Sequence, residues 1–231
     1  MSNSFLPNCS YSIRLLDKLT LLDAKNILDF PMIKKAISFA KKYHDRQFRK
    51  SGEPFYSHPL EVAYMVSDYS MTTNIIVTSI LHDVVEDSEA TAGMILDEFS
   101  WRIAEMVDML TRDRPDGTKL SVGTILNNAY EKNDKEVLLI KCIDRLHSLQ
   151  TIASMRPHKQ MSNFQEAIDN FFAYTIYLDD FELENTFQTL CLSFFKQQRV
   201  EQTHDSFYKD EILSLFPSSQ NDLQPTLSQH L

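Results

Sequence analysis

Apolar residues recur along most of this chain at the three- and four-residue spacing of amphipathic helices. Between residues 11 and 28, for example, leucine and isoleucine return at almost every third or fourth position. The same periodicity, with a proline at two of the expected starts, predicts a series of helices. Their ranges are 11–28, 31–40, 59–66, 73–86, 91–98, 101–111, 121–133, 135–153, 160–178 and 180–198.

Glycine, which most often marks turns, occurs only four times in 231 residues. The clearest interruptions are a Ser-Gly-Glu-Pro loop within residues 46–57 and an Arg-Pro-Asp-Gly turn within residues 111–118. The chain therefore predicts an all-α fold of roughly eight to ten helices around one core. We expect an N-terminal arm and helix over residues 1–30, one domain over 31–200, and a polar, disordered tail over 201–231.

The composition is that of an ordinary soluble globular protein, with 43% hydrophobic and 24% charged residues. Three scattered cysteines lack a metal-binding spacing, which indicates reduced thiols. The N-terminus lacks the basic start and apolar segment of a signal peptide, and no apolar run approaches the roughly 20 residues that span a bilayer. We therefore expect a cytoplasmic protein that does not enter a membrane.

The formal net charge of −9 argues against general nucleic-acid binding, which depends on clustered Lys and Arg. Basic residues nevertheless gather in residues 41–50, in a turn-rich group of Arg112, Arg114 and Lys119, and in a group between 141 and 159. Each group alone is compatible with a solvated helix face. The alternative is that these groups bind a small anionic substrate, because they lie beside the candidate metal ligands described below.

The predicted helix over residues 73–86 is apolar on nearly all sides and ends in ionisable residues, His82-Asp83-Val84-Val85-Glu86-Asp87. Helical spacing places these side chains near one sector of a buried helix. Burying the carboxylates without partners would cost on the order of several kcal/mol. A divalent metal bound by His82 and Asp83 would offset that cost, with Glu86 and Asp87 one turn beyond. The alternative is a solvated acidic cluster, since His-Asp is a common dipeptide.

Two distant residues favour the metal. His58, followed by Pro59, lies at a loop-to-helix junction from which its ring can point into a cleft. Asp144 lies within a strongly apolar predicted helix, where a carboxylate needs either a structural partner such as Arg145 or a metal. The mixed histidine and aspartate set suits Mn²⁺, Fe²⁺ or Zn²⁺ and, lacking thiolates, leaves room for water. We expect His147, three residues after Asp144, to orient or pack rather than to ligate.

The order of these motifs resembles the hydrolase domain of the RelA/SpoT family, within the wider HD superfamily. The motifs are His58-Pro59, Leu81-His82-Asp83-Val84-Val85-Glu86-Asp87 and Asp144-Arg145-Leu146-His147, preceded by Gln47-Phe48-Arg49-Lys50-Ser51-Gly52-Glu53-Pro54-Phe55. The last stretch is similar to the family's Gln-x-Arg-Lys-Ser-Gly-Glu-Pro-Tyr segment. The resemblance covers roughly residues 35–180, and several motifs in the correct order make it specific.

The resemblance implies an HD-type helical array and the activity of a guanosine-3′,5′-bis(diphosphate) 3′-pyrophosphohydrolase. Such an enzyme hydrolyses the 3′-pyrophosphate of guanosine tetra- or pentaphosphate, (p)ppGpp, to pyrophosphate and GDP or GTP, with Mn²⁺. The implied metal ligands are His58, His82, Asp83 and Asp144; the pair for water and proton transfer is Glu86 and Asp87; the substrate contacts are Arg46, Arg49, Lys50, Ser148 and Thr151. The chain is too short for the synthetase and regulatory domains of bifunctional members, so we expect a stand-alone small alarmone hydrolase.

Three departures from the family pattern lie outside the metal and acid/base positions. Ser148 replaces the usual Asn, Arg46 replaces the usual Gly of His-x-Gly-Gln, and Glu166-Ala167-Ile168 replaces Glu-Thr-Leu. These departures affect substrate positioning, so another nucleotide with a 2′- or 3′-phosphate, such as NADPH, is an alternative substrate. A protein that binds alarmones without hydrolysing them is a further alternative, against which the intact Glu86-Asp87 pair argues.

Overall fold

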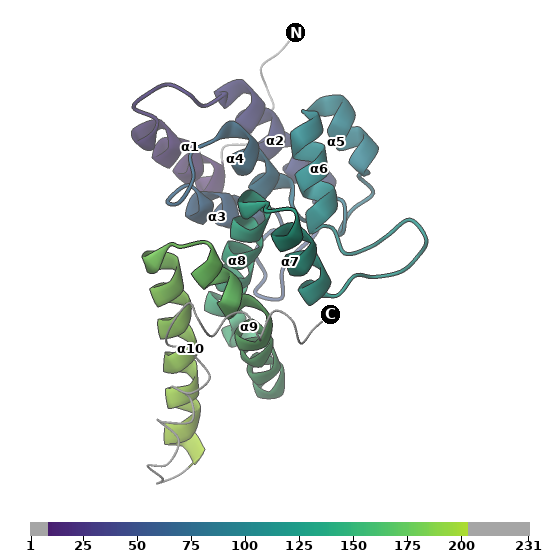
Figure 1. The fold of residues 1–231 in the computed structure, drawn as a ribbon. Helices are drawn as coiled ribbons and strands as arrows, with labels where there is room; N and C mark the ends of the chain where they lie inside the picture. The colour runs from purple at the N-terminus through teal and green to yellow at the C-terminus, as the bar shows by residue number, and fades with distance from the viewer. Residues whose placement is uncertain (1–8, 203–231) are drawn as a thin grey trace. The chain divides into compact units, whose positions relative to one another are not determined.

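The computed structural model describes residues 9–202, with side chains as far as residue 198. Within that range the regular structure is helical, and the only β-type pairing is two isolated bridges (Figure 1). The helices are α1 (Ser10–Leu22), α2 (Phe30–Tyr43), α3 (Ser57–Val66), α4 (Thr73–Leu81), α5 (Ala92–Glu98), α6 (Trp101–Leu110), α7 (Val122–Glu131), α8 (Lys135–Gln150), the 3₁₀ helix η1 (Ile152–Ser154), α9 (Pro157–Tyr177) and α10 (Phe181–Gln202). The predicted all-α class is confirmed.

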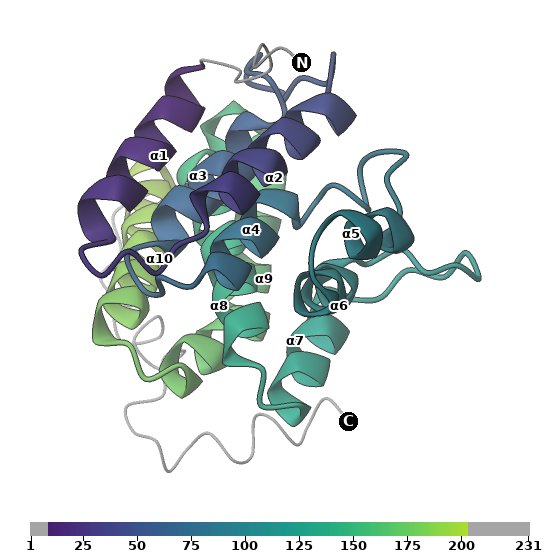
Figure 2. The same ribbon diagram turned by 90° about the horizontal axis from the view of Figure 1, so that it is seen from above.

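The helices form two compact units, the first ending at His147 and the second beginning at Ser148. In the first unit α4 is the central helix. It packs against α2, α3 and α6, and Figure 2 shows it with α2 and α3 on one side and α6 on the other. All residues from 75 to 81 are buried, as the apolar sequence of this segment predicts. His82, which follows directly, therefore begins inside the core.

Polar capping residues set the starts of several helices in the first unit. Thr72, Thr91, Ser100 and Ser121 each accept, through the side chain, a hydrogen bond from the backbone N–H three residues later. A cap of this kind typically contributes about 1 kcal/mol. The caps fix where α4 to α7 begin, which hydrophobic periodicity alone locates only approximately.

In the second unit α9 and α10 pack against each other through aromatic side chains. The rings of Phe164 and Phe194 stack with their centroids 3.8 Å apart. Phe171 and Phe187 are fully buried, with ring centroids 6.4 Å apart. These contacts give the pair of long helices an apolar core of its own.

The helix predicted over residues 11–28 ends earlier, at Leu22. The side chain of Asp23 accepts hydrogen bonds from the backbone N–H groups of Ile27 and Leu28 at 2.9 and 3.1 Å. These bonds close a turn in place of a further helical turn. The apolar residues at 27 and 28 extend the sequence pattern past the end of the helix, which is why the prediction was too long.

The helix predicted over residues 73–86 also ends early, at Leu81. Residues 82–87 form consecutive turns, in which the Val84 N–H donates to the Leu81 carbonyl and the Asp87 N–H to the Asp83 carbonyl. We refer to residues 82–87 as the carboxylate turn. Because it is not a regular helix, its side-chain directions depend on neighbouring segments, and hydrophobic periodicity contains no information about those contacts.

All three cysteines are free, and Cys142 and Cys191 are buried. Among the helices that the structure describes, none is long and apolar enough to cross a bilayer. The predicted arm before residue 9 and residues 203–231 of the predicted tail lie outside the described residues. The extent of a single domain over residues 31–200 stays a prediction.

Candidate metal centre

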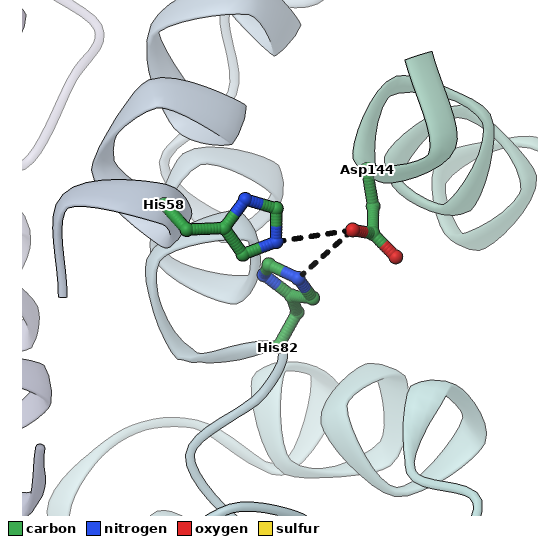
Figure 3. A group of neighbouring side chains, drawn as sticks. All are labelled: His58, His82 and Asp144. Atoms are coloured by element: carbon green, nitrogen blue, oxygen red, sulfur yellow. Dashed lines mark hydrogen bonds and ion pairs between the residues drawn. The ribbon is translucent and has the colours of Figure 1, made fainter. Parts of the chain in front are cut away.

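Segments that are distant in sequence bring predicted metal ligands together in the first unit. His58 lies in the first turn of α3, His82 caps the C-terminus of α4, and Asp144 lies in α8. Oδ1 of Asp144 is 3.1 Å from Nε2 of His58 and 3.7 Å from Nε2 of His82. Figure 3 shows both imidazoles directed at this carboxylate oxygen. The ligand atoms of the three residues lie within 4.8 Å of one another, a spacing that can hold a metal ion.

Asp83, the fourth predicted ligand, lies at the same point. Its Oδ2 is 3.4 Å from Nε2 of His58, and its Oδ1 is 3.1 Å from Nε2 of His82. Both histidines are buried, whereas the side chains of Asp83 and Asp144 are partly exposed. The cluster therefore lies at the edge of an apolar core, with imidazoles on the inner side and carboxylates toward solvent.

The far nitrogen of each imidazole has a partner that leaves Nε2 free to ligate. Nδ1 of His82 is 2.8 Å from the Ser79 carbonyl, which can only accept, so Nδ1 carries the proton. Nδ1 of His58 is 2.8 Å from Nδ1 of His147. Burial, together with the nearby charges of His58 and Arg49, lowers the pKa of His147 to about 3, so His147 is neutral. One of the two Nδ1 atoms carries the proton that they share. Such partners fix the tautomer and ring direction of metal-ligating histidines.

The ionisation of the cluster shows how strongly it favours a cation. Burial alone would lower the pKa of His82, but the carboxylates of Asp83 and Asp144 outweigh it and raise this pKa to about 10. Burial would raise the pKa of Asp83, but His82 and His58 lower it to about 2. The pKa of Asp144 is held well below its usual value by Lys141 and the two histidines, against the effect of burial. In the metal-free protein a proton on His82 therefore supplies the positive charge that a bound metal would supply instead.

Lys141 also belongs to this cluster, although its sequence position alone does not predict a role at the metal site. Its Nζ lies 3.0 Å from Oδ2 of Asp144, one helical turn away, and the residue is buried. Asp144 thus directs Oδ1 toward the histidines and Oδ2 toward Lys141. Lys141 is therefore the positively charged side chain that pairs with Asp144. The two residues are three positions apart on one helix, and this spacing predicts that their side chains are neighbours.

The predicted catalytic carboxylates lie in the carboxylate turn beside the ligands. Oε2 of Glu86 accepts a hydrogen bond from the Arg112 N–H at 3.1 Å, and Oε1 lies 3.1 Å from Nζ of Lys119. Asp87 lies at the exposed edge of the turn. Partial burial and the negative charges of Asp83 and Glu86 raise the pKa of Asp87 to about 6. Asp87 can therefore gain or lose a proton near neutral pH.

The predicted substrate contacts are distributed more widely. Arg49 lies close enough to His147 for its charge to lower the pKa of that ring. Lys50 is exposed, and the Arg46 side chain is 92% exposed beside Asp45. Ser148 and Thr151 belong to the second unit, so they stay predictions, as do the roles of the basic residues.

The donor set fits a divalent metal. Nε2 of His82 is buried without a hydrogen-bond partner of good geometry, and Nε2 of His58 faces the same carboxylate oxygens. Nitrogen and oxygen ligands without thiolate are typical of catalytic rather than closed structural sites. The ion would be held by His58, His82, Asp83 and Asp144. The ring of His58 is held by His147, the ring of His82 by the Ser79 carbonyl, and the carboxylate of Asp144 by Lys141.

Part of the chain, including most of this site, is similar to a known protein family. The family model described as HD domain matches residues 36–116, a range that includes His58, His82, Asp83 and the two carboxylates predicted to be catalytic, Glu86 and Asp87. Asp144 lies beyond the matched range. The match to an HD domain implies that the site binds a divalent metal.

The chain is also similar to proteins of the RelA/SpoT type. It is 34% identical over 153 residues to a GTP pyrophosphokinase of Myxococcus xanthus, covering 61% of this chain and 20% of the relative. It is 27% identical over 201 residues to a guanosine-3′,5′-bis(diphosphate) 3′-pyrophosphohydrolase of Haemophilus influenzae, covering 83% of this chain and 28% of the relative. The Aquifex aeolicus protein of the same name is 27% identical over 179 residues, covering 75% and 25%.

A solved structure of a metazoan ortholog of SpoT, described as hydrolysing ppGpp, has the same fold. It superposes with a TM-score of 0.57 at 21% identity, covering 72% of this chain and 95% of the other. The predicted HD-type helical array is therefore confirmed. The chain spans between about a fifth and just over a quarter of the length of these curated relatives, which are named for two different activities.

Proposed function

We propose that this chain is a metal-dependent phosphohydrolase that removes the 3′-pyrophosphate of (p)ppGpp, with Mn²⁺ as its metal. The observation that carries the proposal is the convergence of His58, His82, Asp83 and Asp144, with Glu86 beside them. The pyrophosphohydrolase relatives support the substrate, because their names specify this reaction and they match three quarters or more of the chain.

The proposed reaction needs one water molecule and two proton movements. The oxygen of water bonds to the phosphorus attached to the 3′-oxygen, the bond from that phosphorus to the 3′-oxygen breaks, and pyrophosphate leaves. One proton is removed from water and one is supplied to the 3′-oxygen. A bound divalent metal supplies Lewis acidity toward water and phosphoryl oxygens. Glu86 and Asp87 move the protons, and Asp87 is suited to this by its pKa of about 6.

The basic loop, residues 46–56, supplies the charge that a polyphosphorylated substrate requires. Arg49, near His147, and the exposed Lys50 and Arg46 are the proposed phosphate contacts. Ser148 and Thr151 are the proposed contacts to the nucleotide. In an acidic protein this local positive charge directs a small anion to the site without general affinity for nucleic acid. The cytoplasmic location predicted from the sequence is part of the same proposal.

Purified protein incubated with Mn²⁺ and ppGpp tests the proposal through release of pyrophosphate. Asp83→Ala is expected to abolish turnover together with Mn²⁺ binding, measured by calorimetry. Glu86→Ala is expected to lower kcat by about 10²–10⁴-fold while Mn²⁺ binding is retained. Asp97→Ala, which removes an exposed carboxylate of α5, is the control. Wild-type protein that binds Mn²⁺ without releasing pyrophosphate would contradict the proposal.

A panel of nucleotides distinguishes the two alternatives. The departures at Arg46 and Ser148 favour testing NADPH and other 2′- or 3′-phosphorylated nucleotides. A higher kcat/KM for NADPH than for ppGpp would show that NADPH is the better substrate of the same metal site. Tight ppGpp binding without turnover in Mn²⁺ would indicate a non-catalytic alarmone-binding protein instead.

A further inference from the structure

A hairpin outside the metal cluster contacts Glu86. It comprises residues 111–121, between α6 and α7, and its tip projects from the helices in both views (Figures 1 and 2). The hairpin contains the basic group Arg112, Arg114 and Lys119. Neither metal binding nor the proposed substrate contacts give these three residues a role.

The hairpin is an ordered element fastened to its neighbours. Backbone hydrogen bonds pair its two sides, and Asp113 and Lys119 face each other across it as an isolated bridge. Nζ of Lys119 lies 3.0 Å from Oδ1 of Asp113. The Arg114 guanidinium donates to the carboxylate of Asp108 at 3.3 Å and to its carbonyl at 3.1 Å, which links the hairpin to α6.

Both oxygens of Glu86 receive a donor from this hairpin. The backbone N–H of Arg112 donates to Oε2 at 3.1 Å. Nζ of Lys119 lies 3.1 Å from Oε1 and so bridges Glu86 and Asp113. The Glu86 side chain is 17% exposed and that of Lys119 is 49% exposed. The carboxylate is therefore largely enclosed, while the ammonium that binds it stays accessible to solvent.

This pair of contacts compensates for the irregular backbone of the carboxylate turn. Glu86 follows α4 by several residues of non-helical chain, so α4 does not fix the direction of its side chain. A backbone donor and a charged donor on separate oxygens fix both the position and the plane of a carboxylate. Groups that move protons require such orientation, because a misplacement of about 1 Å can cost roughly 10²-fold in rate.

We propose that the 111–121 hairpin is the positioning element of Glu86, with the Arg112 amide as its fixed donor and Lys119 as its side-chain donor. Lys119 is a positioning residue, acting through Glu86 rather than on the substrate. The consequence for turnover rests on the proposed function, but the contact between hairpin and carboxylate does not. A competing role, direct binding of substrate phosphate by Lys119, predicts different kinetics.

Replacement of Lys119 separates these roles. Lys119→Met is expected to lower kcat about 10- to 100-fold, with KM within about 3-fold and Mn²⁺ affinity unchanged. Lys119→Arg, which keeps a donor of similar reach, is expected to restore most of kcat. In a Glu86→Gln background, Lys119→Met should cause no further loss, because the residue through which it acts has already changed. Asp113→Asn, which removes the negative charge of the other partner of Lys119 but keeps an acceptor oxygen, is the matched control and should keep kcat near that of the wild type.

Three results would overturn the proposal. The first is a rise in KM with kcat unchanged, which would make Lys119 a substrate contact. The second is a further loss of kcat when Lys119→Met is added to Glu86→Gln. The third is an additive effect of Lys119→Met and Glu86→Gln on the Tm of the metal-free protein. The proposal expects these Tm shifts to be non-additive, because the two residues share a contact. Additive shifts would show that the contact is not made, even if the protein proves inactive on ppGpp.

Discussion

Arg46 has a backbone conformation that side chains other than glycine rarely adopt. Its φ is +61°, in the left-handed region. Among residues 9–202, the other non-glycine residues with positive φ are Asn26, Asn133 and Asp179, types that tolerate this region best. The RelA/SpoT pattern has glycine at position 46, and the structure gives the reason: the chain turns there from α2 into the basic loop with positive φ. Arg46 satisfies the turn at a conformational cost.

Arg46→Gly is therefore expected to stabilise the protein by about 1 kcal/mol, because glycine removes the left-handed strain. For a chain of this size that corresponds to a rise in Tm of about 2–4 °C. The same variant tests the predicted substrate contact, since loss of a phosphate-binding guanidinium raises KM. A lower Tm would show that the Arg46 side chain contributes more than its exposed position indicates.

The gathering of the ionisable residues could largely be predicted from the sequence. A carboxylate in an apolar helix needs a cation, and Asp144 indeed lies beside histidines and a lysine. The identity of that lysine was missed because Arg145 is adjacent in sequence, whereas helical geometry favours the residue three positions away. The contacts of Glu86 could not be predicted, because Lys119 approaches from a separate segment and no local spacing encodes that contact.

At the scale of elements, the carboxylate turn depends on two neighbouring segments. The hairpin binds Glu86, and the basic loop binds Asp87 through Gln47, whose Nε2 donates to the Asp87 carbonyl at 2.8 Å. Oε1 of Gln47 in turn accepts from Nδ1 of the buried His44 at 2.8 Å. The two residues predicted to transfer protons thus contact two of the three basic segments, the hairpin and the basic loop.

Gln47→Met keeps the length of the side chain but removes both hydrogen bonds. We expect it to destabilise the protein by about 1–3 kcal/mol, because the buried Nδ1–H of His44 loses its acceptor. We also expect kcat to fall while Mn²⁺ affinity is unchanged, since Gln47 contacts the turn rather than a ligand. Urea denaturation and steady-state kinetics measure the two effects, with the exposed Gln165→Met as control. Unchanged stability would show that water replaces the amide at His44.

Helix existence could be predicted almost throughout, but helix ends could not. α2, α3 and α5 to α10 lie close to their predicted ranges, because each buries an apolar stripe. α1 and α4 end early, since Asp23 closes a turn after α1 and the carboxylate turn begins after α4. In both cases apolar or ionisable residues continue the helical spacing beyond the helix. The competing signal is side-chain hydrogen bonding to the backbone, which periodicity does not measure.

At the scale of the molecule, the metal is expected to couple local ionisation to the stability of the fold. His82 has a pKa of about 10 in the folded, metal-free chain, above its usual value of 6.5. The stabilisation that this gives the metal-free protein is present below pH 6.5 and is lost as pH rises toward 10. Ligation requires the neutral ring, so a metal must displace this proton.

Mn²⁺ is therefore expected to raise Tm, and to raise it more at pH 8.0 than at pH 6.5. Below a pKa of about 10 the affinity should increase by up to about tenfold per pH unit, with about one proton released per ion. At a hundredfold excess over Kd the ion adds about 2.7 kcal/mol to the free energy of unfolding. Thermal melts with and without EDTA, and calorimetry in buffers of different ionisation enthalpy, measure both quantities. His82→Ala should abolish the shift, whereas a proton count of zero would contradict the ionisation of His82.

The wide spacing of the four predicted metal ligands along the chain has a consequence for how the protein is made. His58, His82 and Asp83 leave the ribosome well before Asp144. Until α8 has been synthesised and has packed beside α3 and the end of α4, the growing chain presents an incomplete ligand set, which binds an ion weakly. We therefore expect metal loading to be a late event in biogenesis, which follows assembly of the helices of the first unit in their native arrangement.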